Sequence, residues 1–326
     1  MNPVKSKKYD FDITVTDNTY AGELALPYVT AAVTGAETIT NNRCRLIEGV
    51  VHKAVISNLG LTDVIQAADC GGSDGGNTSL TEQIVTLNDL MVKEVICRKT
   101  IFPTFIAAQG RMRRDGQIPP AFAEFLLSSV AAKAGQNLET LLWAGDAADP
   151  GIWGLGLLSN DGVIDEDGID NSAMGSFAQV TTAAAFTAAN ILGEMNKVFA
   201  GVAATPGIML KPGAGFYISY EAYAFFQQAQ AEQNTGAGYN QDLSGASYLG
   251  YPVYPTAGIA NTADAIAFTY PDNIVVGTNA YTGNESAALI PVYQYDGSDN
   301  VKATMNFAVG VNVAVPTDGV VGFAFT

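Results

Sequence analysis

The chain has 326 residues and a formal net charge of −16, and 48% of its residues are hydrophobic while only 15% are charged. This length suffices for one large or two ordinary domains, and the apolar fraction allows a sizeable core. The first residues, MNPVKSKKYDFD, contain no apolar segment typical of a signal peptide, and no run of 18 apolar residues could cross a membrane. These features predict a protein made in a cytoplasm, with no membrane partner.

The charge is unevenly distributed along the chain. Residues 1–114 carry 12 basic and 12 acidic side chains, whereas residues 115–326 carry 4 basic and 20 acidic ones. Because an acidic surface repels a polyanion, we do not expect the second part of the chain to bind nucleic acid. The segregation suggests that the N-terminal region, which contains most of the basic residues, meets acidic surfaces of other copies.

The sequence offers few residues for catalysis or metal binding. It has one histidine, His52, and three cysteines whose spacing matches no zinc or redox motif, Cys44, Cys70 and Cys97. Histidine-based triads and zinc sites are therefore not expected. The glycine-rich run at 71–76 lacks the Lys-Ser/Thr of a phosphate-binding loop, and the acidic loop at 159–180 fits no calcium-binding register. We expect no enzyme activity, no metal and no cofactor.

The first third of the chain predicts an arm, a helix and a hairpin. Residues 1–38 are polar and Thr-rich, which favours an extended arm with little structure. In residues 40–59 apolar pairs recur every four residues, which predicts a helix ending at Gly60. Residues 61–106 are rich in β-branched side chains on both sides of a glycine-rich stretch, Cys70–Asn77, and predict a long hairpin with a flexible tip. A hairpin of this kind is not stable alone, so we expect it to lie on a partner.

The middle of the chain predicts a long amphipathic helix over residues 119–144. Two prolines suit its first turn, apolar residues follow at four-residue spacing, and Gly145 ends it. We expect this helix to lie across a sheet, with Leu126 and Leu138 buried against a long strand.

The second half predicts shorter helices and then strands. We expect a helix at 183–200, a short strand at 208–210, a helix at 220–233 capped by Ser219, and a strand at 265–270. From 301 to 315 every odd position is apolar, which predicts a half-buried strand on the order of 50 Å long. A turn at 295–298 returns the preceding strand onto it.

The order of these segments resembles the major capsid proteins of tailed phages with the Hong Kong 97 fold. Three motifs carry the resemblance: the Leu-Leu-x-x-Gly-Asp end of the long helix with the following Gly-Leu-Leu, a Leu-Gly-x-Pro-Val motif, and the stretch Tyr-Pro-Asp-Asn-Ile-Val-Val-Gly-Thr. They lie at 141–158, 249–253 and 270–278, and the resemblance covers roughly residues 40–326. It implies an α+β, Hong Kong 97-like capsid fold, with a peripheral domain, an axial domain, an extended hairpin loop and an N-terminal arm.

The resemblance also implies a domain division. The N-terminal arm and helix would occupy 1–60, the extended hairpin 61–106, the peripheral domain 107–203 and 275–326 with its spine helix at 119–144, and the axial domain 204–274.

The implied function is that of a major capsid protein, which self-assembles into pentamers and hexamers of an icosahedral phage head. It would enclose a DNA genome without sequence-specific binding, and would be found in the virion after assembly in the host cytoplasm. Scaffold, portal and decoration proteins are implied as partners. Two alternatives stay open, namely an encapsulin-type nanocompartment shell, which shares the fold but encloses protein cargo, and a cytoplasmic β-rich binding module.

Two segments are predicted to contact neighbouring copies. The first is the hairpin tip, with Gly71, Gly72, Asp74 and Gly75. The second is the densest positive charge in the chain, Arg111, Arg113 and Arg114. These arginines have one nearby acid, and the guanidinium fork suits an interface ion pair. A solvated basic loop, or a loop that faces packaged DNA, is the alternative for the arginines.

Overall fold

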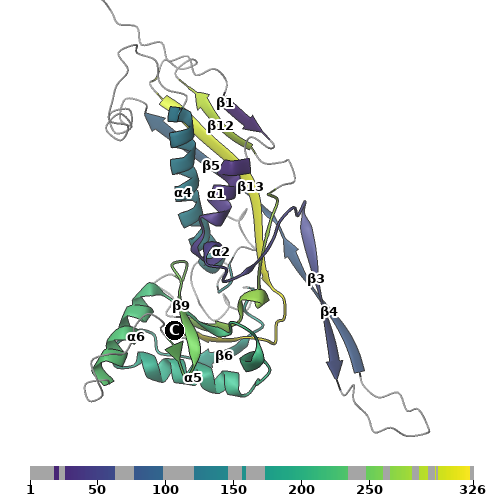
Figure 1. Cartoon of the computed structure of the whole chain (residues 1–326), viewed down its shortest axis with the longest axis vertical. Helices are drawn as coiled ribbons and strands as arrows, with labels where there is room; N and C mark the ends of the chain where they lie inside the picture. Colours follow the sequence, from purple (N-terminus) through teal and green to yellow (C-terminus); the bar gives the residue numbers. More distant parts are fainter. Residues whose placement is uncertain are drawn as a thin grey trace, which may run out of the picture.

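The computed structural model describes residues 18–21, 26–62, 77–97, 121–145, 156–158, 173–233, 247–259, 265–280, 286–292, 298 and 300–323. These residues form two units and a projecting hairpin (Figure 1). Each unit is built on a six-stranded sheet, and the hairpin is a separate two-stranded sheet.

The first unit places helices on one face of a mostly antiparallel sheet. The strand order is β1-β12-β13-β11-β2, and β5 also pairs with β13, on the edge opposite β12. The strands are β1 (Asn18–Ala21), β2 (Arg45–Ile47), β5 (Asn88–Cys97), β11 (Ile274–Thr278), β12 (Ser286–Pro291) and β13 (Asn300–Val313). The helices are α1 (Leu26–Thr34), α2 (Glu37–Thr40) and α4 (Ala121–Ala144). Helices α1 and α4 lie side by side against this sheet (Figure 1).

The predicted long helix and long strand are confirmed. Helix α4 begins two residues after the predicted start and has 24 residues, and β13 has 14. Leu126 and Leu138 are 3% and 1% exposed, and Leu138 lies in the same core as Phe307 and Val309 of β13. The helix therefore buries its apolar side on the sheet, as its periodicity indicates.

The motif after the helix closes its C-terminal end. A helix leaves its last carbonyl groups without intrahelical partners. Here the amide of Leu157 donates to the Leu142 carbonyl at 2.8 Å, and the amide of Leu158 donates to the Trp143 carbonyl at 2.9 Å. The Gly-Leu-Leu motif thus supplies the missing donors, while both leucine side chains enter the core.

The second unit contains a smaller mixed sheet covered by two helices. The strand order is β6-β14-β10-β7-β9-β8. The strands are β6 (Ala178–Thr181), β7 (Gly215–Ile218), β8 (Ser247–Tyr248), β9 (Tyr251–Pro255), β10 (Ile266–Thr269) and β14 (Val320–Phe323). The helices are α5 (Ile191–Ala203) and α6 (Tyr220–Gln233), with 3-10 turns η3 (Ile208–Leu210) and η4 (Pro271–Asn273). The helix at 220–233 and the strand at 265–270 are confirmed, and Ser219 Oγ accepts the Ala222 amide at 3.1 Å as a cap.

The projecting hairpin consists of β3 (Lys53–Thr62) and β4 (Asn77–Thr86). Its register runs from Lys53 opposite Thr86 to Thr62 opposite Asn77. Figure 1 shows it leaving the body beside β13 and extending away from both units. Ten residues per strand correspond to about 33 Å of reach.

The predicted helix at 40–59 is wrong. Its residues form β2 and the first part of β3 instead. The apolar pairs that suggested a four-residue period also satisfy the two-residue period of a strand, and β3 alternates strictly between more and less exposed side chains. The hairpin therefore begins at Lys53 rather than at 61, and its return strand ends at Thr86, before β5 joins the first sheet.

Other local predictions also need correction. Residues 1–38 are not all an unstructured arm, because β1, α1 and the beginning of α2 lie within them. Two of the buried residues here are small, Ala32 and Ala36. The chain directly after α1 lies so close to α4 that a Cβ on Gly135 would be 2.7 Å from the Gly35 Cα. The helix predicted at 183–200 begins only at Ile191, and the strand predicted at 208–210 is a 3-10 turn. The turn predicted at 295–298 lies almost entirely outside the described residues.

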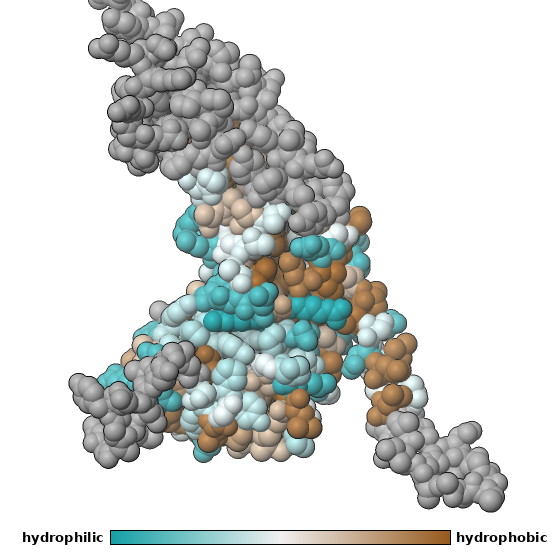
Figure 2. All heavy atoms as spheres, in the orientation of Figure 1, coloured by the Kyte–Doolittle hydropathy of each residue, from teal (hydrophilic) through white to brown (hydrophobic). Residues whose placement is uncertain are grey.

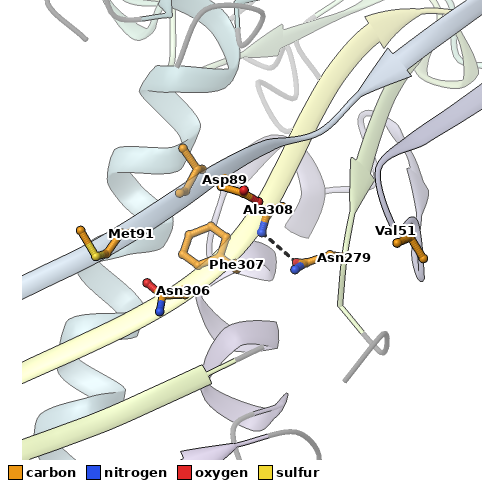
Figure 3. A pocket seen from close by; sticks show the side chains of 8 residues that line it. Val51, Asp89, Met91, Asn279, Asn306, Phe307 and Ala308 are labelled. Atoms are coloured by element: carbon orange, nitrogen blue, oxygen red, sulfur yellow. Dashed lines mark hydrogen bonds between the residues drawn. The ribbon is translucent and has the colours of Figure 1, made fainter. Parts of the chain in front are cut away.

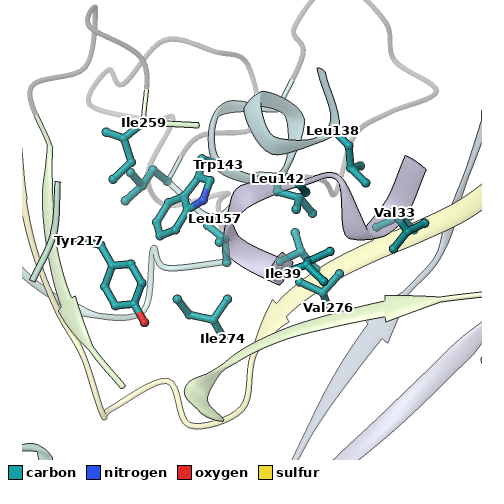
Figure 4. Packing of buried hydrophobic residues seen from close by; sticks show 14 of the residues in the cluster. Val33, Ile39, Leu138, Leu142, Trp143, Leu157, Tyr217, Ile259, Ile274 and Val276 are labelled. Carbon is teal, nitrogen blue, oxygen red and sulfur yellow. The ribbon is translucent and has the colours of Figure 1, made fainter. Parts of the chain in front are cut away.

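The core runs through both units. Its larger cluster joins α4 and β13 to residues of the second sheet, as Figure 4 shows around Trp143 and Tyr217. A second cluster lies between α5, α6 and the second sheet. Helix α5 therefore packs with the second unit, whereas the predicted boundary at 203/204 grouped it with the long helix.

Candidate inter-subunit surfaces and the joint between the units

The hairpin carries an exposed row of apolar side chains on one face, here called the apolar stripe. Its members are Val55, Leu59, Leu61, Leu80 and Ile84, which are 48–62% exposed. The register places Val55 opposite Ile84 and Leu59 opposite Leu80, so directly paired residues share this face. Figure 2 shows hydrophobic side chains along the hairpin. A contiguous exposed apolar surface of this kind marks a site of interaction.

The opposite face of the hairpin anchors its root to the body. Ile56 and Val85 are buried there in a small cluster with Val275 and Ala314. In addition, the Asn312 side-chain amide donates to the Ile84 carbonyl at 2.8 Å. The root is therefore fixed, and the apolar stripe keeps one orientation relative to the sheet.

The outer face of the first sheet has its own exposed apolar residues beside the hairpin root. Met91 and Val95 of β5 are 65% and 56% exposed. A groove of about 310 Å³ lies here, and we call it the outer groove. Its lining residues, drawn in Figure 3, are Val51, Asp89, Leu90, Met91, Asn279, Asn306, Phe307 and Ala308. Asn279 braces this wall, because its Oδ1 accepts the Ala308 amide at 2.8 Å.

Two lysines lie close together on the same outer face. Lys93 of β5 is opposite Thr304, and Lys302 of β13 is opposite Val95, so the two lysines are diagonal neighbours. Desolvation, and then the hydrogen bond with Lys93 and its charge, lower the pKa of the Lys302 ammonium. Two adjacent cations in an acidic chain make this surface complementary to a carboxylate.

The two units meet at a segment that includes α2, and its inner side is a buried polar network. The Glu139 carboxylate of α4 accepts the Thr38 amide at 2.9 Å and the Thr38 hydroxyl at 2.6 Å. The Trp143 indole N–H donates to the Thr38 hydroxyl at 2.9 Å. All three residues are at most 2% exposed. The network therefore fixes α2 to the end of the long helix.

Burial dominates the acid–base properties of this network. It raises the pKa of the Glu139 carboxyl, although the hydrogen bonds from Thr38 act in the opposite direction. Burial and then the Glu139 charge raise the pKa of the adjacent Cys44 thiol to about 12. Cys44 is therefore an inert thiol, which donates a weak bond to the Thr38 carbonyl at 3.8 Å.

The outer side of the same segment binds the second unit. Glu37 accepts the Tyr220 hydroxyl at 2.5 Å and the Ala257 amide at 3.2 Å. Arg43 lies 3.5 Å from Glu37, donates to the Pro255 carbonyl, and stacks 5.4 Å from the centre of the Tyr254 ring. These groups come from α6, β9 and the loop after β9, so one short segment ties three parts of the second unit.

The residues that the sequence predicted to make contacts lie outside the described residues. This holds for Gly71, Gly72, Asp74, Gly75, Arg111, Arg113 and Arg114, and for most of the acidic loop. The surfaces described above were missed. The alternation in 53–61 could have revealed the apolar stripe, but the Thr38–Glu139 contact spans 101 residues and leaves no local signal.

Neither a cluster of metal ligands nor a membrane-spanning helix is found among the described residues. Within these ranges, no group of three His, Cys, Asp or Glu side chains is arranged to hold a metal ion. No helix among them is long and apolar enough to span a bilayer. His52, the single histidine, is exposed on the turn before β3.

Comparison by sequence identifies no relative. No family model matches the chain. No curated protein matches it either.

Comparison of structures, in contrast, finds capsid subunits that match along almost the whole chain. A chain of the satellite phage P4 procapsid has a TM-score of 0.59 at 12% identity, covering 92% of this chain and 90% of that one. A chain from the capsid of a native GTA particle has a TM-score of 0.55 at 13% identity, with 91% of each chain covered. One from the capsid of Myoviridae phage XM1 has a TM-score of 0.53 at 9% identity, with 88% and 91% covered. The chain therefore has the α+β, Hong Kong 97-like fold of tailed-phage capsid proteins.

Proposed function

We propose that this chain is the major capsid protein of a tailed DNA phage and forms the shell of its head. The observation that carries the proposal is the likeness to capsid subunits over about nine tenths of both chains. Fold alone does not establish function, so the surfaces must fit as well. The exposed apolar stripe and the outer groove fit a subunit that is covered by its neighbours.

In this proposal the first unit is the peripheral domain and the second unit is the axial domain. Helix α4 is the spine helix, and the β3–β4 hairpin is the extended loop. The predicted division at 1–60, 61–106, 107–203 with 275–326, and 204–274 serves as its outline. The packing of α5 with the second sheet supports moving that helix into the axial domain.

The hairpin of one copy would lie on the outer face of the next. Its apolar stripe surrounds the exposed Glu82, which is opposite Ser57 on the same face. The receiving face offers apolar Met91 and Val95 together with the Lys93–Lys302 pair. The two surfaces are therefore complementary: apolar side chains would meet apolar ones, and the Glu82 carboxylate would meet the two lysines.

The remaining partners follow from the same role. The subunit would assemble into pentamers and hexamers in the host cytoplasm and remain in the virion. It would enclose DNA without reading its sequence, and would meet scaffold, portal and decoration proteins. The hairpin tip and the arginines at 111–114 would contact neighbouring copies. No enzymatic step is part of this role.

Imaging of the purified, full-length protein tests the proposal. Negative-stain micrographs should show closed shells, and a shell population that contains nucleic acid supports the phage head. Empty shells, or shells filled with protein, would favour an encapsulin-type compartment. Monomers at every protein and salt concentration would contradict both.

A further inference from the structure

At the joint between the two units, the neighbouring residues Thr38 and Glu37 bind in opposite directions. Thr38 bonds to Glu139 and Trp143 at the end of the spine helix. Its neighbour Glu37 bonds to Tyr220 and Ala257 of the second unit. Because both residues belong to the short helix α2, this helix cannot move without straining one of these two sets of bonds.

The two sets of bonds differ in their access to water. The Thr38 side is buried, and breaking it would leave the Glu139 carboxylate in the core without its donors. On the other side, the Glu37 and Arg43 side chains are 22% and 14% exposed, and Tyr220 is 51% exposed. Hydrogen bonds and ion pairs that are accessible to solvent can be replaced by bonds to water with only a small change in free energy. The Glu37 side is therefore the one that can open.

A contact that could act as a pivot lies beside these outer bonds. Gly258, next to Ala257, lies so close to the spine helix that a Cβ there would be 2.3 Å from the Glu139 carbonyl oxygen and from the Trp143 ring. Trp143 packs on Tyr217, with ring centres 5.6 Å apart, and Tyr217 packs on Tyr254 at 5.1 Å. Aromatic rings packed at a tilt, as these are, can slide by small amounts while their surface remains buried.

We propose that Glu37, Arg43 and Tyr220 form a releasable latch between the spine helix and the axial domain. With the latch closed, the axial domain has one angle to the spine helix. With it open, the domain turns about the contact at Gly258 while α2 stays on the helix. Resting on the proposed function, this inference explains how one chain could fit positions of different curvature in a shell.

The test uses the full chain and a variant that leaves most of the latch intact. Tyr220→Phe removes the hydroxyl that donates to Glu37, but it leaves both partners of the hydrogen bond from the Ala257 amide to Glu37 in place. If the latch acts as a unit, exchange of the Ala257 amide with deuterium in unassembled protein should become roughly three- to tenfold faster. Exchange of the Thr38 amide should not change, and assembly should give shells of more than one diameter.

Tyr223→Phe, on the same helix, is the matched control. If the Ala257 amide exchanges at the same rate in Tyr220→Phe, in Tyr223→Phe and in the unmodified chain, the latch is overturned. It is also overturned if Tyr220→Phe accelerates exchange of the Thr38 amide as much as that of the Ala257 amide. If the unmodified chain forms no shells, the proposed function fails, yet the exchange rates still decide whether the latch exists. Glu37→Ala should likewise leave exchange of the Thr38 amide unchanged and give shells of more than one diameter. Glu48→Ala, at an exposed position, is its control.

Discussion

The carboxylate of Glu139 and the backbone of Thr38, 101 residues apart in sequence, meet in the core at 2.9 Å. A buried carboxylate is tolerated only when donors surround it. Thr38 supplies two of these donors, its amide and its hydroxyl, and Trp143 orients the hydroxyl from the other side. The pair fastens the N-terminal segment to the spine helix.

Glu139→Gln should keep the shape of this network while removing its charge. A glutamine can accept the Thr38 amide and donate to the Thr38 hydroxyl, so we expect stability at neutral pH to be unchanged or higher. Glu139→Ala should instead lower the free energy of unfolding by about 3 kcal/mol, because it leaves buried donors without partners. Urea unfolding of both variants measures the difference, and equal losses would contradict the role of the hydrogen bonds.

The same residue gives a pH dependence of defined sign. Burial raises the pKa of Glu139 above 4.5, so the folded state binds a proton more tightly than the unfolded state. This contribution to stability is fully present below pH 4.5 and is lost as the pH rises through the raised pKa. Glu139→Gln should remove that component. A stability–pH curve with the same slope in both proteins would argue against a raised pKa.

How much of the fold and of the candidate surfaces could be predicted depends on how far apart in sequence the interacting residues lie. The spine helix, the strand at 300–313 and the Ser219 cap each follow from a short sequence period or a local hydrogen bond. Residues 53–59 of β3 were predicted as part of a helix at 40–59, because the apolar side chains that alternate along this strand are exposed and do not mark a core face. The contact of Thr38 with Glu139 forms only in the tertiary fold, so no short sequence pattern could have predicted it.

Leu126→Ala should lower the free energy of unfolding by roughly 2–5 kcal/mol, because the side chain is 3% exposed and its removal leaves a cavity. Thr140→Ala, at an exposed position of the same helix, should change it by less than about 0.5 kcal/mol. Chemical denaturation of the unassembled protein measures both. Similar small values would mean that this part of the helix does not pack as described.

The apolar stripe should matter for assembly and not for folding. Leu59→Thr with Leu80→Thr keeps two strand-forming residues at a paired position, and both leucines are more than half exposed. We expect an unchanged thermal melt and few or no shells. Asn58→Thr, on the opposite face of β3, is the control that should assemble normally. Normal shells from the double variant would exclude the stripe from the interface.

The hairpin tip should be dispensable for folding. Deletion of residues 70–77 removes a glycine-rich sequence without large apolar side chains, so the subunit should melt as before. Shell yield should fall, because the tip is predicted to contact a neighbouring copy. Calorimetry and electron microscopy of the same preparation check both expectations, and normal shells would reduce the tip to a spacer.

The final prediction concerns the three arginines. Arg111, Arg113 and Arg114 have one acid beside them, whereas residues 115–326 carry sixteen more negative than positive charges. We expect these arginines to meet acidic residues of a neighbouring copy, since the guanidinium fork binds a carboxylate with two hydrogen bonds. Such pairs are screened by salt, so association of the unmodified subunits should weaken at high ionic strength.

Charge reversal of all three arginines to glutamate tests this role. Shell formation should stop, while the thermal melt of the subunit should stay almost the same, because exposed charges contribute little to folding. The control reverses Lys133, an exposed lysine on the spine helix, which should leave assembly intact. If the triple variant assembles equally well at low and high salt, the arginines form a solvated loop or face the enclosed DNA, and the inter-subunit role is refuted.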